Sequence, residues 1–83
     1  MLTLQFYTRP DCTLCHSALA VVHRVQKKLP FDLNVINIDE DSALRQRYDT
    51  VIPVLTCGNI DLARTFIEEK SLGLALKKLA SPS

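Results

Sequence analysis

The sequence predicts a small α/β domain with the element order β-α-β-α-β-β-α. Residues 2–7 alternate apolar and polar side chains, which is typical of a strand, and residues 14–29 carry apolar side chains at helical spacing. Residues 31–38 are rich in β-branched side chains and predict a second strand. These three segments form a β-α-β unit, which almost always crosses over right-handed and places its two strands parallel.

Two breaks in the pattern place the next elements. The first helix is expected to end at Leu29-Pro30, because proline lacks an amide donor and disfavours helical geometry in the residue before it. The acidic residues at 39–41 are expected to supply the negative first turn of a short helix over residues 42–48.

A hairpin and a last helix complete the expected order. Residues 51–57 and 60–62 predict two short strands around Gly58-Asn59, a pair that is typical of tight hairpin turns. Residues 68–79 predict a helix with four apolar side chains on its inner face: Leu72, Ala75, Leu76 and Leu79.

Length and composition limit the class of protein. A chain of 83 residues that is 47% hydrophobic has room for one core, so we expect one domain over residues 1–83. The formal net charge is +1 and the basic residues are scattered, so we expect no binding to nucleic acid or to a membrane. No apolar run approaches the ~20 residues that a membrane span needs, and residues 1–7 are too short for a secretory signal. We therefore expect a cytoplasmic location. We also expect a monomer.

The segment Cys12-Thr13-Leu14-Cys15 lies where the first strand leads into the first helix. The unpaired N–H groups and the dipole of a helix N-terminus favour negative charge there. A cysteine in such a place can lower its pKa from about 8.5 to roughly 3.5–7.5 and exist as a thiolate near neutral pH. Because a second thiol follows one helical turn later, this pair favours reversible disulfide exchange.

Helical geometry predicts different exposure for the two cysteines. The apolar face of the first helix is expected to centre on five residues: Leu14, Ala18, Val21, Val25 and Leu29. Cys15 lies roughly 70° from that centre and Cys12 roughly 130° from it. We therefore expect Cys12 to be the exposed, attacking thiol and Cys15 the shielded, resolving thiol.

Two other interpretations of the cysteine pair are weaker. One interpretation is that the pair is half of a zinc site. The remaining candidate ligands are Cys57, His16 and His23, and the sequence has no second Cys-x-x-Cys and no His-x-x-x-His to complete such a site. A structural disulfide is disfavoured because three cysteines without a signal segment indicate a reducing compartment, and because so short a loop constrains little.

The whole pattern resembles the thioredoxin fold, in which helices flank a four-stranded mixed sheet. The resemblance rests on a Cys-x-x-Cys that opens the first helix and on a proline, Pro53, that opens the third strand. The segments Phe-Tyr-Thr-Arg-Pro-Asp-Cys-Thr-Leu-Cys at 6–15 and Val-Ile-Pro-Val at 51–54 are most similar to glutaredoxins, and within them to the short glutaredoxin-like proteins. This resemblance covers nearly the whole chain.

The resemblance implies roles for individual residues. Cys12 would be the nucleophile and Cys15 the resolving thiol. Pro53 would follow a cis peptide bond and pack against the cysteines, and Ile52 would present its backbone to a bound thiol peptide by short antiparallel pairing. Arg9 matches the basic residue that helps glutaredoxins hold a carboxylate of glutathione.

The chain departs from glutaredoxins after the hairpin. Glutaredoxins usually carry a Gly-Gly-x-Asp type of segment there, which binds the γ-glutamyl end of glutathione, whereas residues 62–66 are Leu-Ala-Arg-Thr-Phe. Glutathione is therefore a candidate reductant that this segment disfavours, and the expected chemistry requires no cofactor.

Four further side chains have two interpretations each. Tyr7 either flanks the cysteines or ends its strand with a half-buried ring. Arg9 either stabilises the neighbouring thiolate, against the opposite effect of Asp11, or is simply solvated. A surface position is favoured over a proton relay for His16, and a buried apolar position over a redox role for Cys57.

Together these observations predict a glutaredoxin-like thiol–disulfide oxidoreductase. Its expected partners are protein or small-molecule disulfides and a cellular thiol that reduces it again. The alternative from another class is a binding module that holds a metal or an iron–sulfur cluster through Cys12, and a third is a redox-inert adaptor that keeps the fold.

Overall fold

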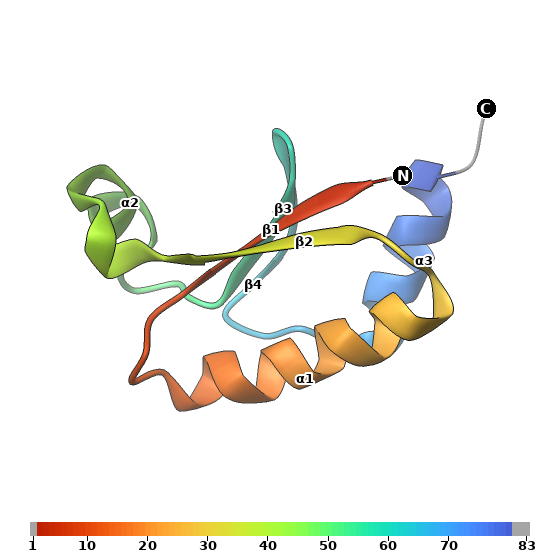
Figure 1. Cartoon of the computed structure of the whole chain (residues 1–83), viewed down its shortest axis with the longest axis horizontal. Coiled ribbons are helices and arrows are strands. Elements are labelled where there is room, and N and C mark those ends of the chain that lie inside the picture. Colours follow the sequence, from red (N-terminus) through yellow and green to blue (C-terminus); the bar gives the residue numbers. More distant parts are fainter. Residues whose placement is uncertain (1, 81–83) are drawn as a thin grey trace.

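The computed structural model describes residues 2–80 and contains one four-stranded sheet with three α-helices and one short 3-10 helix (Figure 1). The strand order is β2-β1-β3-β4; β1 pairs parallel with β2 and antiparallel with β3, and β3 pairs antiparallel with β4. This mixed sheet confirms the predicted fold class. The elements, in chain order, are β1 (Thr3–Thr8), α1 (Thr13–Lys28), β2 (Asp32–Asn37), η1 (Ile38–Glu40), α2 (Ser42–Tyr48), β3 (Val54–Cys57), β4 (Ile60–Arg64) and α3 (Glu69–Ala80).

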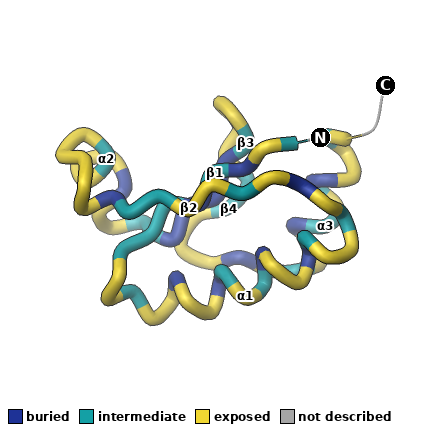
Figure 2. Tube along the Cα trace, in the orientation of Figure 1, coloured by how far each residue is buried: buried dark blue, intermediate teal, exposed yellow. Residues whose placement is uncertain are grey.

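One face of the sheet is covered by α1 and α3, and α2 packs at one end of the other face. Consecutive strand residues point to opposite faces, and the neighbours Leu55 and Val54 accordingly belong to two separate buried clusters. The larger cluster joins the sheet to α1 and α3, which lie side by side in Figure 1. The smaller cluster is formed by Ile38, Tyr48 and Val54 and packs α2 near the ends of β1 and β3. Figure 2 shows how the helices keep their outer faces exposed.

The apolar face of α1 differs from the predicted one. Its buried residues are Cys15, Ala18, Val22 and Val25, so the face is rotated relative to a centre on Leu14. Leu14, which was expected at the middle of this face, is 56% exposed, and that prediction is wrong. The physical reason is its position in the first turn of α1, where it lines a surface hollow with the 65–67 segment instead of facing the sheet.

Two boundaries also differ from the sequence-based expectation. Of the acidic residues at 39–41, only Asp41 serves α2, as the N-cap whose carboxylate accepts the N–H groups of Ala43 and Leu44. The other two belong to η1, which the sequence did not indicate. The third strand begins at Val54 rather than at residue 51, because the chain passes first through a cis peptide bond at Ile52–Pro53.

Charged side chains join the two helices on the larger cluster. Arg24 of α1 donates from Nε to Oε1 of Glu69 at 2.9 Å, and Lys28 Nζ lies 3.6 Å from the other carboxylate oxygen. The hydrogen bond from Arg24 is the main reason why the pKa of Glu69 lies below its ordinary value. None of the helices in the described range is long and apolar enough to cross a membrane.

Glu69→Gln tests this connection between α1 and α3 through the pH dependence of stability. The pKa of Glu69 is lowered by folding, so the ion pair stabilises the fold above the unfolded pKa and is lost as the pH falls through the folded pKa. Below about pH 5, the melting temperature of the wild-type protein should therefore fall more steeply than that of Glu69→Gln. The difference should be small and decrease with added salt, since Arg24 is exposed and Glu69 is partly exposed.

Glu68→Gln is the matched control, because the Glu68 carboxylate forms no ion pair within residues 2–80. Its melting curve should follow the wild type at every pH. Parallel curves for Glu69→Gln and the wild-type protein would show that the ion pair contributes nothing.

Candidate functional site

The backbone of Cys12 is fixed on both sides by hydrogen bonds. Cys12 is the N-cap of α1, and its carbonyl accepts the N–H of His16 at 3.3 Å. Its own N–H donates to the carbonyl of Arg9 at 3.2 Å, which closes the turn between β1 and the helix. Cys12 therefore stands just before the helix rather than within its first turn, at the point where the helix dipole favours negative charge.

The sulfur of Cys12 takes the place of a capping oxygen. Its Sγ accepts the N–H of Cys15 at 3.1 Å, a bond that Ser, Thr, Asp or Asn usually makes at this position. The same N–H would donate to a thiolate in the reduced protein. Hydrogen bonding to the charged form of a group lowers its pKa, so this geometry favours the ionised state of Cys12.

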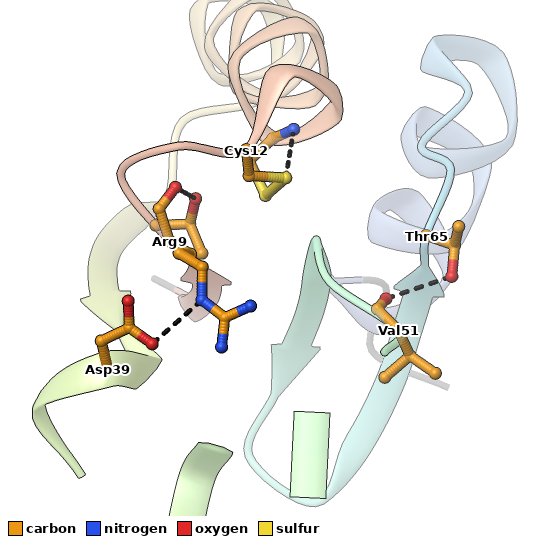
Figure 3. Close-up of a disulfide and its surroundings, with 7 residues drawn as sticks. Arg9, Cys12, Asp39, Val51 and Thr65 are labelled. Carbon is orange, nitrogen blue, oxygen red and sulfur yellow. Dashed lines mark hydrogen bonds and ion pairs between the residues drawn. A yellow bond between two sulfur atoms is a disulfide. The ribbon is translucent and has the colours of Figure 1, made fainter. Parts of the chain in front are cut away.

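The two cysteines form a disulfide (Figure 3). They differ in burial as predicted. Their Cα atoms lie 5.1 Å apart. Cys15 is 1% exposed and belongs to the larger buried cluster, whereas Cys12 is partly exposed at the edge of that cluster. An incoming disulfide can therefore reach Cys12 more readily than Cys15.

The loop before β3 contains the predicted cis bond at Ile52–Pro53, which confirms that expectation. Pro53 is buried, and Ile52 packs against the same large cluster as Cys12. The carbonyls of Val51 and Pro53 both accept the N–H of Thr65, at 2.9 and 2.7 Å. Ile52, between them, makes no backbone hydrogen bond to any other residue of the described chain. Its N–H and carbonyl are therefore without a backbone partner among residues 2–80.

Arg9 is bound by two carboxylates of the protein itself. Its Nε donates to Asp39 at 2.9 Å and its Nη2 to Asp49 at 2.5 Å. Asp49, which accepts the shorter bond, and then Asp39 hold the pKa of Arg9 above its ordinary value. In Figure 3 the guanidinium extends toward Asp39. These two carboxylates offset the charge of the guanidinium, so Arg9 serves first to anchor the loop that precedes Cys12.

Tyr7 lies with its ring stacked on Tyr48 of α2, with the ring centroids 4.5 Å apart. It is half-buried against the smaller cluster, which Ile52 also contacts. This agrees with the interpretation of a tyrosine that ends its strand. A direct contact of Tyr7 with substrate stays a prediction.

Between the start of α1 and the segment after β4, the structure reveals an apolar hollow that the sequence did not indicate. Its volume is about 220 Å³, and the exposed side chains of Leu14 and Phe66 line it together with Val21. Phe66 is 73% exposed. In the sequence it is distinguished only as the last residue of the 62–66 segment, which lacks glycines. No sequence signal marks the hollow, because it depends on how the loop after β4 approaches the start of α1.

The remaining candidates take no part in this arrangement. Cys57 is a free thiol at the end of β3 and is only partly buried, because the strand leads there into the exposed turn at Gly58. The expectation of a buried Cys57 is therefore only half correct. His16 is exposed, as favoured. Among residues 2–80 there is no group of three or more His, Cys, Asp or Glu side chains placed to bind a metal ion.

Comparison with known proteins agrees with this geometry. The family model described as Glutaredoxin-like domain matches residues 3–78. The solution structure of the protein Ne2328 from Nitrosomonas europaea is 33% identical, with a TM-score of 0.77, and the match covers 89% of each chain. A structural genomics target from X. campestris is 26% identical, with a TM-score of 0.77, over 95% of this chain and 99% of that one.

A more distant match shows the fold alone. Glutaredoxin from Brucella melitensis is 21% identical, with a TM-score of 0.60, and the match covers 96% of this chain and 83% of that one. The search of curated protein sequences found no match.

The unequal burial of the two thiols predicts unequal rates of alkylation. After reduction, a short pulse of iodoacetamide near neutral pH should modify Cys12 at least about tenfold faster than Cys15, because both access and thiolate fraction favour Cys12. Mass spectrometry of proteolytic peptides after timed quenching measures both rates in one sample. Cys57 provides an internal reference on a different element. Faster modification of Cys15 than of Cys12 would contradict the assignment of the attacking thiol.

Proposed function

The chain belongs to the glutaredoxin-like domain family, and we propose that it acts as a thiol–disulfide oxidoreductase through Cys12 and Cys15. The observation that carries this proposal is the N-cap position of Cys12, disulfide-bonded to a buried Cys15. An N-cap sulfur that accepts a backbone N–H is stabilised as an anion. The thiol of Cys15, buried one turn away, is protected from side reactions until a mixed disulfide forms on Cys12.

The reaction proceeds in two exchanges. In the reduced protein, the thiolate of Cys12 attacks one sulfur of a substrate disulfide and forms a mixed disulfide, while the other substrate sulfur leaves as a thiolate and takes up a proton. Cys15 then loses its proton and attacks Sγ of Cys12, which releases the second substrate thiol and forms the Cys12–Cys15 disulfide. The substrate gains two electrons and the dithiol loses two. A cellular thiol reductant returns the pair to the reduced state.

The surroundings of the disulfide favour polypeptide disulfides as substrates. The free backbone groups of Ile52 fit short antiparallel pairing with an extended peptide. The hollow between Leu14 and Phe66 would accept an apolar side chain next to the substrate half-cystine. Arg9, which would hold a small anionic thiol such as glutathione, is already bound to Asp39 and Asp49.

The proposed reaction requires no bound cofactor. It requires a disulfide substrate and a thiol reductant, both of which a reducing compartment such as the cytoplasm provides. A monomer suffices, because one chain supplies both thiols.

Cysteine variants test the two exchanges. Incubated with a small disulfide, Cys12→Ser should form no mixed disulfide at Cys15 above the rate of an unstructured thiol. Cys15→Ser should form a stable mixed disulfide at Cys12, because no nearby thiol resolves it. Cys57→Ser is the matched control and should complete the cycle like the wild type, because Cys57 lies on another element. Intact-mass spectrometry after acid quenching distinguishes these products.

The same experiment also tests the alternative class. If neither Cys12 nor Cys15 reacts faster than an unstructured cysteine, the oxidoreductase proposal is wrong. Freshly purified protein that is brown and absorbs visible light would indicate a cluster-binding module instead.

Glutathione should bind weakly, with a dissociation constant above about 1 mM, because Arg9 is already paired. A titration followed by amide chemical shifts measures this. The double variant Asp39→Asn/Asp49→Asn frees the guanidinium and should strengthen binding by several fold, while adding Arg9→Gln to it should remove the gain. Tight binding to the wild-type protein, with shifts across Arg9 and Ile52, would overturn the preference for polypeptides.

A further inference from the structure

Thr65 has an unfavourable backbone conformation next to the redox site. Its φ is 65°, and within residues 2–80 it is the only residue other than glycine with a positive φ. Its Cβ is crowded in this region, and a β-branched side chain makes such a φ a true outlier. The N–H of Phe66 donates to the carbonyl of Arg64 at 2.6 Å, which closes a γ-turn with Thr65 at its centre. A γ-turn with positive φ at its central residue is the rare, strained form.

The contacts of Thr65 converge on the loop before β3. Its N–H donates to the carbonyls of Val51 and Pro53, and its hydroxyl donates to the carbonyl of Val51 at 3.1 Å. Figure 3 shows a Thr65–Val51 bond across from the disulfide. Thr65 thus binds the residues immediately before and after Ile52, from the position directly after β4.

These bonds fix the position of Ile52 but leave its own N–H and carbonyl without a backbone partner in the described part of the chain. With the carbonyls on both sides occupied by Thr65, the peptide groups of Ile52 are the ones in this loop that remain for an incoming chain. Fixing a recognition edge before binding reduces the entropy that is lost when a ligand pairs with it. Strained backbone that is maintained by surrounding contacts is commonly found at active sites and ligand-binding segments.

A glycine at position 65 would adopt the positive φ without steric cost and would keep the two N–H bonds. What threonine adds is the hydroxyl bond to Val51 and a side chain that restricts the local backbone. The specific contribution of Thr65 is therefore rigidity of the 51–53 loop rather than the turn itself.

We propose that Thr65 is a positioning residue that holds the 51–53 loop so that Ile52 can pair with the backbone of a polypeptide disulfide. This inference rests on the proposed oxidoreductase function and specifies its substrate class. The hydrogen bonds of Thr65 go to the 51–53 loop and not to the reacting sulfurs, so it acts through Ile52; it also lines the hollow beside Leu14 and Phe66. Its contribution therefore appears with substrates that carry a peptide backbone on both sides of the half-cystine and is absent with disulfides that have none.

The test compares two substrates. One is a disulfide formed between two copies of a short, end-capped peptide whose central cysteine is flanked by glycines, so that no substrate side chain enters the hollow that Thr65 also lines. The other is hydroxyethyl disulfide, which has no backbone. Thr65→Val keeps the shape of the side chain but removes the hydroxyl. It should raise KM for the peptide disulfide about 3- to 10-fold, the effect of one lost hydrogen bond, with little change in kcat. Turnover of hydroxyethyl disulfide should stay within about twofold of wild type, since no loop pairing is involved.

Two further variants separate positioning from stability. Thr65→Ser retains the hydroxyl and should preserve the wild-type KM. Thr65→Gly relieves the backbone strain, so it should melt at or above the wild-type temperature, yet its KM for the peptide should rise like that of Thr65→Val. A purely structural role cannot produce higher stability together with weaker peptide capture. Thr65→Gly also keeps the test decisive if Thr65→Val fails to fold.

The outcomes distinguish this inference from the proposed function. If the wild-type protein reduces neither substrate, the oxidoreductase proposal itself is wrong. If the wild type reduces both, and the Val and Gly variants either match it on the peptide or lose activity equally on both substrates, Thr65 has no positioning role. A selective rise in KM for the peptide in Thr65→Val and Thr65→Gly, with recovery in Thr65→Ser, supports the inference.

Discussion

The hydrogen bond from the N–H of Cys15 to the sulfur of Cys12 is the interaction on which the site depends. It exists only if Cys12 stands at the N-cap with extended backbone, φ −90° and ψ 106°, while Cys15 is already inside the helix. That requirement separates the two thiols into different surroundings. Cys12 remains at the surface beside unpaired helix N–H groups, and Cys15 is drawn into the core. The different roles of the two sulfurs, attack by Cys12 and resolution by Cys15, therefore follow from the position at which α1 begins.

Distant parts of the chain hold this boundary and its neighbouring loop in place. Arg9 connects the turn before Cys12 to η1 and to the end of α2 through Asp39 and Asp49. Thr65 connects the end of β4 to the loop that contains the cis bond. Both anchors join segments that are remote in sequence, so each forms only when the sheet has brought those segments together. A rigid scaffold of this kind reduces the rearrangement that the reacting groups need when a substrate arrives.

Much of this arrangement could be predicted from the sequence, because its signals are local. The element order, the span of α2 and the burial of Cys15 follow from periodicity, capping and the Cys-x-x-Cys segment, whereas the cis bond at Pro53 is expected only from the resemblance to glutaredoxins. Three features could not be predicted. Leu14 is apolar and correctly spaced, but it lies in the first turn of α1, where it lines a surface hollow with the 65–67 segment. The partners of Arg9 lie 30 and 40 residues away. Nothing about threonine signals a positive φ, which usually belongs to glycine or asparagine.

The most direct test of the account is the pKa of Cys12, measured by the ultraviolet absorbance of its thiolate. In Cys15→Ser/Cys57→Ser, Cys12 is the only remaining thiol, and residue 15 keeps the backbone N–H that donates to its sulfur. The account predicts a pKa below the usual value of about 8.5, within the range of roughly 3.5–7.5 found for thiols at helix N-termini. The pKa of Cys12 should return to about 8.5 when the protein is unfolded in denaturant. A folded protein in which Cys12 titrates at or above 8.5 would contradict the claim that this helix terminus creates the nucleophile.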